Sequence, residues 1–271
     1  MFEDLVYEVA AGVATITLDR PDKLNALRER TFDELAEALR AAGADETAGV
    51  VVLTGAGRAF SAGGDLEMAQ SVLTSERAGR HHYFGRMIAA SDVIVAMDKP
   101  VVCAVTGPCV GGGAELMTFA DYVVADDTAF FVFNGTSIGG CSWWGGPQLL
   151  PLQVGLRRAE EILYLSARVP AEEAARIGMI NRVVPAGELQ AAVNETCERL
   201  LDLSEDGLRM TKAALRSVKQ VLLSTMAASA EMNVAALGKP QLHDAFDAFL
   251  EGREMSWRNL RPGFGTNARS E

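Results

Sequence analysis

The sequence has little that would support metal, redox or nucleic-acid chemistry. Only three histidines occur among 271 residues, and none of the four cysteines stands at the CxxC spacing of a zinc or redox motif. We therefore expect neither a metal site nor a disulfide framework. The formal net charge of −11 argues against nucleic acid and anionic membrane as partners, although a local basic cluster can still bind an anion.

Long apolar runs and a basic leader are also missing. No apolar stretch approaches the roughly 20 residues of a membrane-spanning helix. The start of the chain carries Glu3, Asp4 and Glu8, whereas secretory and organellar leaders are basic there. We therefore expect a cytoplasmic protein without a membrane partner. Its composition, 49% hydrophobic and 23% charged, suits one large soluble domain with a full core.

Short apolar strands alternate with amphipathic helices in the first part of the chain. Residues 50–53 and 101–105 are continuous apolar runs, typical of strands that are buried on both faces. Residues 31–42 place their apolar side chains on one face and predict a helix, with Thr31 and Glu34 as a capping box at its start. This alternation predicts an α/β core.

From residue 156 onward the pattern becomes helical. We expect helices over residues 157–166, 171–177, 188–203, 208–223 and 242–260. The chain is therefore divided into a mixed α/β core over residues 1–198 and an all-helical part over residues 199–271.

Two glycine-rich turns have the clearest chemical meaning. One covers residues 58–66 (Arg-Ala-Phe-Ser-Ala-Gly-Gly-Asp-Leu), and the other covers residues 107–116 (Gly-Pro-Cys-Val-Gly-Gly-Gly-Ala-Glu-Leu). Each follows a strand and opens an expected helix, where the first N–H groups lack internal partners and the helix dipole adds positive charge. Each turn alone is equally consistent with a tight turn that binds nothing. Facing each other, the two would hold an oxyanion between backbone donors.

Taken together, the two turns resemble those of the crotonase (enoyl-CoA hydratase/isomerase) family. The resemblance runs from about residue 13 to residue 264 and includes residues 20–27 (Arg-Pro-Asp-Lys-Leu-Asn-Ala-Leu), which are similar to the family's early coenzyme A loop. It implies a spiral of ββα turns with a C-terminal helical oligomerisation part, and assembly as a trimer or a pair of trimers. No separate cofactor is implied, because coenzyme A is carried as part of the acyl-CoA substrate.

The resemblance also implies site residues. The N–H groups of Gly64 and Gly112 would form the oxyanion hole, and Glu115 matches the first of the two glutamates that hydratases use. Basic residues of the early loop would meet the coenzyme A phosphates, and Trp143 would favour a bulky acyl group. The implied substrate contacts are Lys23, Ala26, Ala62, Asp65, His82, Gly135 and Trp143, with Arg20 and Arg28 as further candidates for the phosphates.

The second glutamate of the hydratases is missing. Gly135 occupies its expected position, and no carboxylate lies between residues 128 and 159. Residues 134–146 also resemble the branch of dihydroxynaphthoyl-CoA synthase and 2-ketocyclohexanecarboxyl-CoA hydrolase, in which a glycine stands here and bicarbonate can fill the gap. That branch relies on an aspartate that would fall near Ser142, and it typically lacks a match to Glu115.

Several functions therefore remain open. The first is an enoyl-CoA hydratase-like lyase that works with one glutamate. The second is a C–C bond hydrolase or cyclising synthase acting on a cyclic β-keto acyl-CoA. A double-bond isomerase comes third, and a non-catalytic acyl-CoA-binding protein comes fourth.

Overall fold

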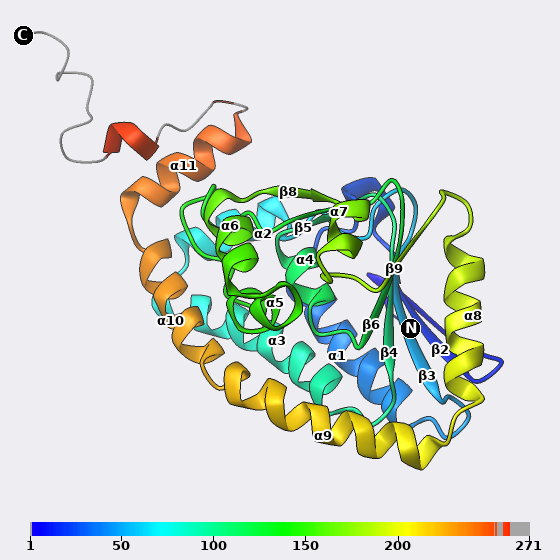
Figure 1. The fold of residues 1–271 in the computed structure, drawn as a ribbon. Helices are drawn as coiled ribbons and strands as arrows, with labels where there is room; N and C mark the ends of the chain where they lie inside the picture. Colours follow the sequence, from blue (N-terminus) through cyan, green and yellow to red (C-terminus); the bar gives the residue numbers. More distant parts are fainter. Residues whose placement is uncertain (1, 252, 254–256, 261–271) are drawn as a thin grey trace, which may run out of the picture.

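The protein folds around a six-stranded sheet with helices on both faces (Figure 1). A computed structural model describes residues 2–251, 253 and 257–260. The strands are β1 (Leu5–Ala10), β2 (Val13–Leu18), β3 (Val50–Gly55), β4 (Val101–Val105), β5 (Pro108–Val110), β6 (Tyr122–Asp126), β7 (Phe130–Val132), β8 (Arg168–Pro170) and β9 (Arg182–Val184). The large sheet has the order β1-β2-β3-β4-β6-β9, and a smaller sheet has the order β5-β7-β8.

Both sheets are mixed. In the large sheet β1 and β2 form an antiparallel hairpin, whereas the pairings from β2 through β9 are parallel. In the small sheet β5 pairs parallel with β7, and β7 pairs antiparallel with β8. The crossovers are made by helices, as parallel strands require. The α/β expectation is confirmed.

Helices occupy most of the remaining chain. They are α1 (Glu29–Ala44), α2 (Leu66–Thr74), α3 (Arg77–Ala96), α4 (Gly112–Met117), α5 (Gly146–Val154), α6 (Leu156–Leu165), α7 (Ala171–Arg176), α8 (Leu189–Leu201), α9 (Glu205–Leu223), α10 (Met226–Leu237) and α11 (Pro240–Leu250), with 3₁₀ turns at Pro21–Lys23 and Trp257–Leu260. The proposed boundary near residue 198 falls in the last turn of α8, just before the short connection to α9.

Alternate residues of the central strands enter two separate apolar clusters. Val51 and Leu53 of β3 pack into the main core, which includes α1 and α3, whereas Val50 and Val52 pack against α8. Figure 1 shows α8 on one side of the sheet and α1 and α3 on the other. The continuous apolar run in this strand is therefore explained by burial on both faces.

The start of α1 differs from the predicted capping box. The helix begins at Glu29, so Thr31 lies inside its first turn, where its hydroxyl accepts a hydrogen bond of 3.1 Å from the Arg28 N–H. The Glu34 carboxylate instead accepts hydrogen bonds from the N–H groups of Glu3 and Asp4. Glu34 therefore holds the residues just before β1, a long-range contact that no local pattern could have revealed.

Two further differences concern the C-terminal part. Helix α10 was not predicted, because its sequence is almost uniformly small and apolar and offers no polar face to read. The expected helix over residues 242–260 ends at Leu250, and residues 252 and 254–256 lie outside the described residues. No single described helix has the length and apolarity to cross a membrane, and one bent pair, Glu205–Leu237 with Pro240–Ala248, meets the test by length and composition only.

Candidate active site

The two glycine-rich turns face each other across one cavity of about 240 Å³. A β-bridge joins Ser61 to Cys109, and a Cβ atom placed on Gly63 would lie only 3.4 Å from the Gly112 nitrogen. Both turns contribute to the cavity wall. The wall includes Ala62, Gly63 and Gly64 from the first turn and Gly111, Gly112 and Glu115 from the second.

Two backbone donors of these turns are free. The N–H groups of Gly64 and Gly112 find no acceptor among the described residues, whereas the neighbouring Asp65 N–H donates to the Leu27 carbonyl. Gly112 is the first residue of α4, so its N–H also lies at the positive end of the helix dipole. Both glycines line the cavity, and unpaired backbone donors are suited to hold a negatively charged oxygen.

The Glu115 carboxylate lies in the same cavity with 6% of its surface exposed. Its Oε1 atom accepts a hydrogen bond of 2.8 Å from the Trp144 N–H. Burial raises the pKa of Glu115 to about 8, even though hydrogen bonds from the Trp144 and Trp143 N–H groups act in the opposite direction. A carboxyl group that titrates near neutral pH can both take and return a proton.

Gly135 lines the cavity, but the space beside it is filled by protein. A Cβ atom on this residue would lie 2.2 Å from the Ser142 nitrogen and 2.3 Å from the Cys141 carbonyl carbon. No side chain fits there unless the loop moves. The backbone of residues 141–142 therefore occupies the space that a glutamate at position 135 would need. The loop is held by Asn233 of α10, whose side chain accepts from the Cys141 N–H and donates to the Cys141 sulfur.

Aromatic rings form another wall of the cavity. Trp143 packs against Phe84 with ring centroids 4.6 Å apart, and Tyr83 lies beside Phe84 at 5.4 Å. Trp144 points into the core instead, where its indole N–H donates to the Ser91 hydroxyl. The structure therefore brings Trp143 to the cavity and separates it from its neighbour.

The basic residues of the early loop are mostly committed to carboxylates. Arg28 donates to Glu3 and Asp4, and Arg20 donates to the Asp65 carboxylate at 2.8 Å and to the Ala26 carbonyl. Ala26 itself does not line the cavity. Lys23 is the exception, because 61% of its side chain is exposed and its contact with Glu67 is a long 3.8 Å. Of the residues expected to bind phosphate, Lys23 is therefore the one whose charge is most exposed and least neutralised by a carboxylate.

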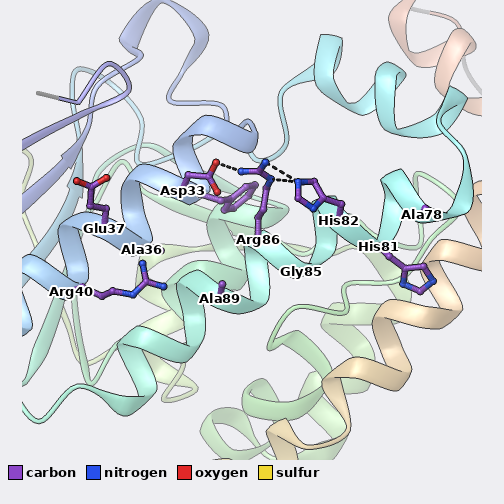
Figure 2. A pocket seen from close by; sticks show the side chains of 11 residues that line it. Asp33, Ala36, Glu37, Arg40, Ala78, His81, His82, Gly85, Arg86 and Ala89 are labelled. Atoms are coloured by element: carbon purple, nitrogen blue, oxygen red, sulfur yellow. Dashed lines mark hydrogen bonds and ion pairs between the residues drawn. The ribbon is translucent and has the colours of Figure 1, made fainter.

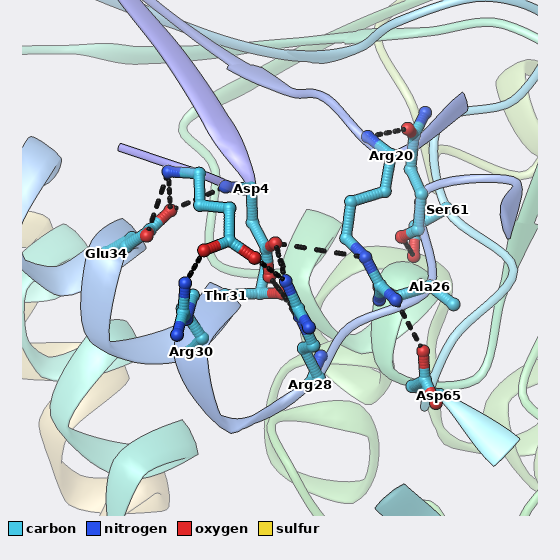
Figure 3. Close-up of polar contacts among 11 residues, drawn as sticks. Asp4, Arg20, Ala26, Arg28, Arg30, Thr31, Glu34, Ser61 and Asp65 are labelled. Carbon is cyan, nitrogen blue, oxygen red and sulfur yellow. Dashed lines mark hydrogen bonds and ion pairs between the residues drawn. The ribbon is translucent and has the colours of Figure 1, made fainter. Parts of the chain in front are cut away.

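Asp65 connects the first turn to a buried ion-pair network, which Figure 3 shows. Its carboxylate caps α2 by accepting from the Glu67 and Met68 N–H groups and also contacts Arg20. Arg20 in turn lies 3.8 Å from Asp4, whose side chain is 1% exposed. The network therefore links Asp4, just before β1, to the residue that follows Gly64.

Asp4 is held ionised within this network. Burial raises the pKa of its carboxyl, but hydrogen bonds from Arg28 and Thr31 and the charges of Arg28 and Arg20 outweigh that effect, so the pKa lies below the usual 3.8. The stabilisation is therefore present above that usual pKa and is lost as the pH falls through the lower folded value.

Replacing Asp4 by asparagine should lower the free energy of unfolding by about 2–3 kcal/mol, because it removes the buried counter-charge of Arg28 and one of the two carboxylates beside Arg20. Chemical denaturation at neutral pH measures this loss. The difference in the free energy of unfolding between the variant and the unmodified chain should become smaller in acid. Glu3→Gln is the matched control, since Glu3 contacts the same Arg28 from an exposed position and should change stability little. Equal losses in both variants would contradict the role of the buried carboxylate.

His82 does not reach the cavity. It lies on the outer face of α3, where its Nε2 atom is 2.8 Å from an Arg86 nitrogen, and Arg86 also pairs with Asp33 of α1 (Figure 2). His81 points toward α10 and lies 3.2 Å from a Glu231 oxygen. Both line a separate surface hollow, because α3 turns the next two residues, Tyr83 and Phe84, inward.

The cavity also receives side chains that sequence analysis did not assign to it. Asn233 and Leu237 come from α10, and Leu242 and Phe246 come from α11. They form the part of the cavity wall that comes from the C-terminal helices. Among the described residues, no group of three or more histidines, cysteines or carboxylates is arranged to hold a metal ion.

Comparison with known proteins identifies the family of the chain. Residues 8–260 match the model of the enoyl-CoA hydratase/isomerase family. A probable enoyl-CoA hydratase of Mycobacterium tuberculosis is 38% identical over 88% of this chain and 83% of its own length. A crotonyl-CoA hydratase of Syntrophomonas wolfei is 31% identical over 94% of this chain and 98% of its own length.

The fold agrees as well. The crystal structure of an enoyl-CoA hydratase/isomerase from Xanthobacter autotrophicus superposes with a TM-score of 0.83 and is 32% identical, covering 93% of this chain and 94% of that one. The mixed sheets and the C-terminal helices are thus those of the crotonase fold. The chain belongs to the enoyl-CoA hydratase/isomerase family and is an acyl-CoA enzyme of that type.

Proposed function

We propose that the protein hydrates 2-enoyl-CoA thioesters with Glu115 as its single acid/base carboxylate. Ionised Glu115 takes a proton from water as the water oxygen attacks C3 of the acyl chain. The electron pair moves to the thioester oxygen, which the Gly64 and Gly112 N–H groups hold as an enolate. Glu115 then returns the proton to C2, and the carboxylate is regenerated.

The observation that carries this proposal is the position of Glu115. It is the only carboxylate among the described residues that line the cavity, and it shares that cavity with the two free N–H groups. Its raised pKa of about 8 suits a group that must accept and return one proton in the same turnover. The hydratase names of the relatives from Mycobacterium tuberculosis and Syntrophomonas wolfei support the same reaction.

Cleavage or cyclisation of a β-keto acyl-CoA is less well supported. That chemistry would need water or bicarbonate in a gap beside Gly135, and the Cys141–Ser142 backbone fills the space where a Cβ atom would be.

Turnover of crotonyl-CoA, followed as the loss of the conjugated thioester absorbance, tests the proposed hydratase function. Tight binding of crotonyl-CoA without any hydration would refute the hydratase function.

Alanine should reduce activity strongly at Gly63 but be tolerated at Gly64, the two adjacent glycines of the first turn. Gly63 has φ of +93°, and a Cβ atom there would lie 2.8 Å from the Val110 carbonyl oxygen, so Gly63→Ala must displace the turn. A Cβ atom on Gly64 would meet only a Met68 methyl group, at 3.9 Å. Kinetics on crotonyl-CoA should show kcat reduced about 100-fold in Gly63→Ala, because small misplacements of the donors are costly.

Gly64→Ala is the matched control for this prediction. It keeps the N–H and should retain kcat within about twofold, since ordinary van der Waals contact requires no shift. Circular dichroism and thermal unfolding establish that both variants are folded. Equal activity of the two variants would show that the placement of the first donor does not matter.

A further inference from the structure

The hydroxyl group of Tyr83 has no partner within the protein. Tyr83 lies on α3 with 7% of its surface exposed, and no described residue forms a hydrogen bond with its phenol oxygen. The fully enclosed unpaired side-chain atoms include the Tyr7 hydroxyl but not that of Tyr83. The Tyr83 oxygen therefore touches open space, and the cavity that Tyr83 lines is the one that holds Glu115.

The ring of Tyr83 is fixed in place by its neighbours. It meets Phe32 edge-on, with centroids 5.9 Å apart and planes at 71°, and it lies against Phe84 at 5.4 Å. Such packing leaves little rotational freedom to the ring. The hydroxyl is consequently presented to the cavity at a defined position before any ligand arrives.

Glu115 is close enough to influence this phenol. Burial and then the negative charge of Glu115 raise the pKa of Tyr83, so the group remains a neutral hydrogen-bond donor at any working pH. A buried donor without a protein partner is costly unless a ligand or water satisfies it. The phenol and the Glu115 carboxylate line the same cavity, where a ligand oxygen could accept a hydrogen bond from the phenol.

Hydration needs a second polar group near the reacting water, and the usual place for it is closed at Gly135. Two residues with hydroxyl groups, Tyr83 and Ser142, line the cavity that holds Glu115. The Ser142 oxygen already accepts a hydrogen bond of 3.4 Å from the Gly135 N–H. Of these two hydroxyl groups, only that of Tyr83 has no hydrogen-bond partner in the described part of the protein.

We propose that the Tyr83 hydroxyl donates a hydrogen bond to the oxygen atom at C3 of the acyl chain. This atom is the attacking water in the forward direction and the 3-hydroxyl group of the product in reverse. Tyr83 orients the oxygen and exchanges no proton with it, while Glu115 handles the proton. The role of this oxygen in turnover rests on the proposed hydratase function, but its binding can be measured without turnover.

The test compares two ligands that differ only in this oxygen. Equilibrium binding of 3-hydroxybutyryl-CoA and butyryl-CoA is measured on Glu115→Gln, which prevents turnover, and on the same variant with Tyr83→Phe added. The hydroxylated ligand should bind about 10-fold more tightly to Glu115→Gln, a preference typical of one good hydrogen bond. Adding Tyr83→Phe should reduce the preference to about twofold or less while the affinity for butyryl-CoA stays unchanged.

Ser142→Ala in the same Glu115→Gln background is the matched control and should keep the full preference. The proposal is overturned if Tyr83→Phe keeps the preference, if Ser142→Ala removes it, or if Glu115→Gln shows none. The hydratase assignment is decided separately by turnover of crotonyl-CoA in the unmodified chain. A chain that fails to hydrate but loses the binding preference with Tyr83→Phe would refute the reaction and leave the oxygen-binding role standing.

Discussion

Replacing Glu115 by glutamine should lower kcat for crotonyl-CoA hydration by about 1,000-fold and leave acyl-CoA binding nearly unchanged. Glutamine fits the same space and can still accept the hydrogen bond from the Trp144 N–H, but it cannot take a proton from water. Steady-state kinetics and equilibrium binding of butyryl-CoA separate the two effects. Retention of more than about a tenth of the activity would exclude Glu115 as the acid/base group.

The same substitution should stabilise the fold, and more so at high pH. The pKa of Glu115 rises from 4.5 to about 8 on folding, so the unmodified chain loses stability as the pH climbs between these values. The Glu115→Gln variant does not ionise and so does not lose this stability. The difference in the free energy of unfolding amounts to about 5 kcal/mol at most, at pH values above the folded pKa. Denaturation at about pH 6 and about pH 9 should show an advantage that grows with pH. A constant or absent advantage would mean that Glu115 ionises freely in the fold.

Replacing Gly112 by proline should reduce kcat by about 100-fold to 1,000-fold, because it deletes one donor of the proposed oxyanion hole. Gly112 is the first residue of α4, where its N–H has no intrahelical acceptor and proline is well tolerated. The expected loss therefore comes from the missing hydrogen bond to the enolate. Crotonyl-CoA kinetics on the purified variant measure it.

Gly112→Ala provides the matched control for the deleted donor. It keeps the N–H, and its Cβ atom would lie 3.4 Å from a Leu27 methyl carbon that can shift slightly. We expect at least about a third of the original kcat in the alanine variant, with both variants showing similar thermal unfolding. An active proline variant would remove Gly112 from the oxyanion hole.

The local features of the site could be predicted from sequence because they depend on neighbouring residues. Each glycine turn directly follows a strand and precedes a helix, and Glu115 lies one turn into the second helix. Backbone donors, the dipole and the carboxylate are therefore placed together by short-range geometry. The same kind of local pattern identifies β3 and β4 as strands buried on both faces.

Features that depend on distant segments could not be predicted in this way. The closed space at Gly135 arises because Asn233, nearly a hundred residues later, holds Cys141. The early loop's resemblance favours phosphate binding by Arg20 and Arg28, whereas the fold pairs both with carboxylates. Each of these outcomes is set by long-range packing, which hydrophobic periodicity does not encode.

His82 shows a limit of a different kind. A helix turns each residue about 100° from the last, and α3 places Tyr83 rather than His82 at the cavity. The rotation of α3 is set by the packing of its aromatic residues against α1 and the core. Without the rotation of the helix, the sequence cannot separate His82 from Tyr83 and Phe84 on the same segment as the residues that reach the cavity.

The pH dependence of kcat/KM for crotonyl-CoA tests the central claim most directly, because it counts the ionisations that hydration requires in the free enzyme. With Glu115 as the only carboxylate, the profile should rise to a plateau through one ionisation at about pH 8. The falling limb expected of a second essential acid should be absent up to about pH 10. A bell-shaped profile with two ionisations below that value would contradict the single-carboxylate mechanism.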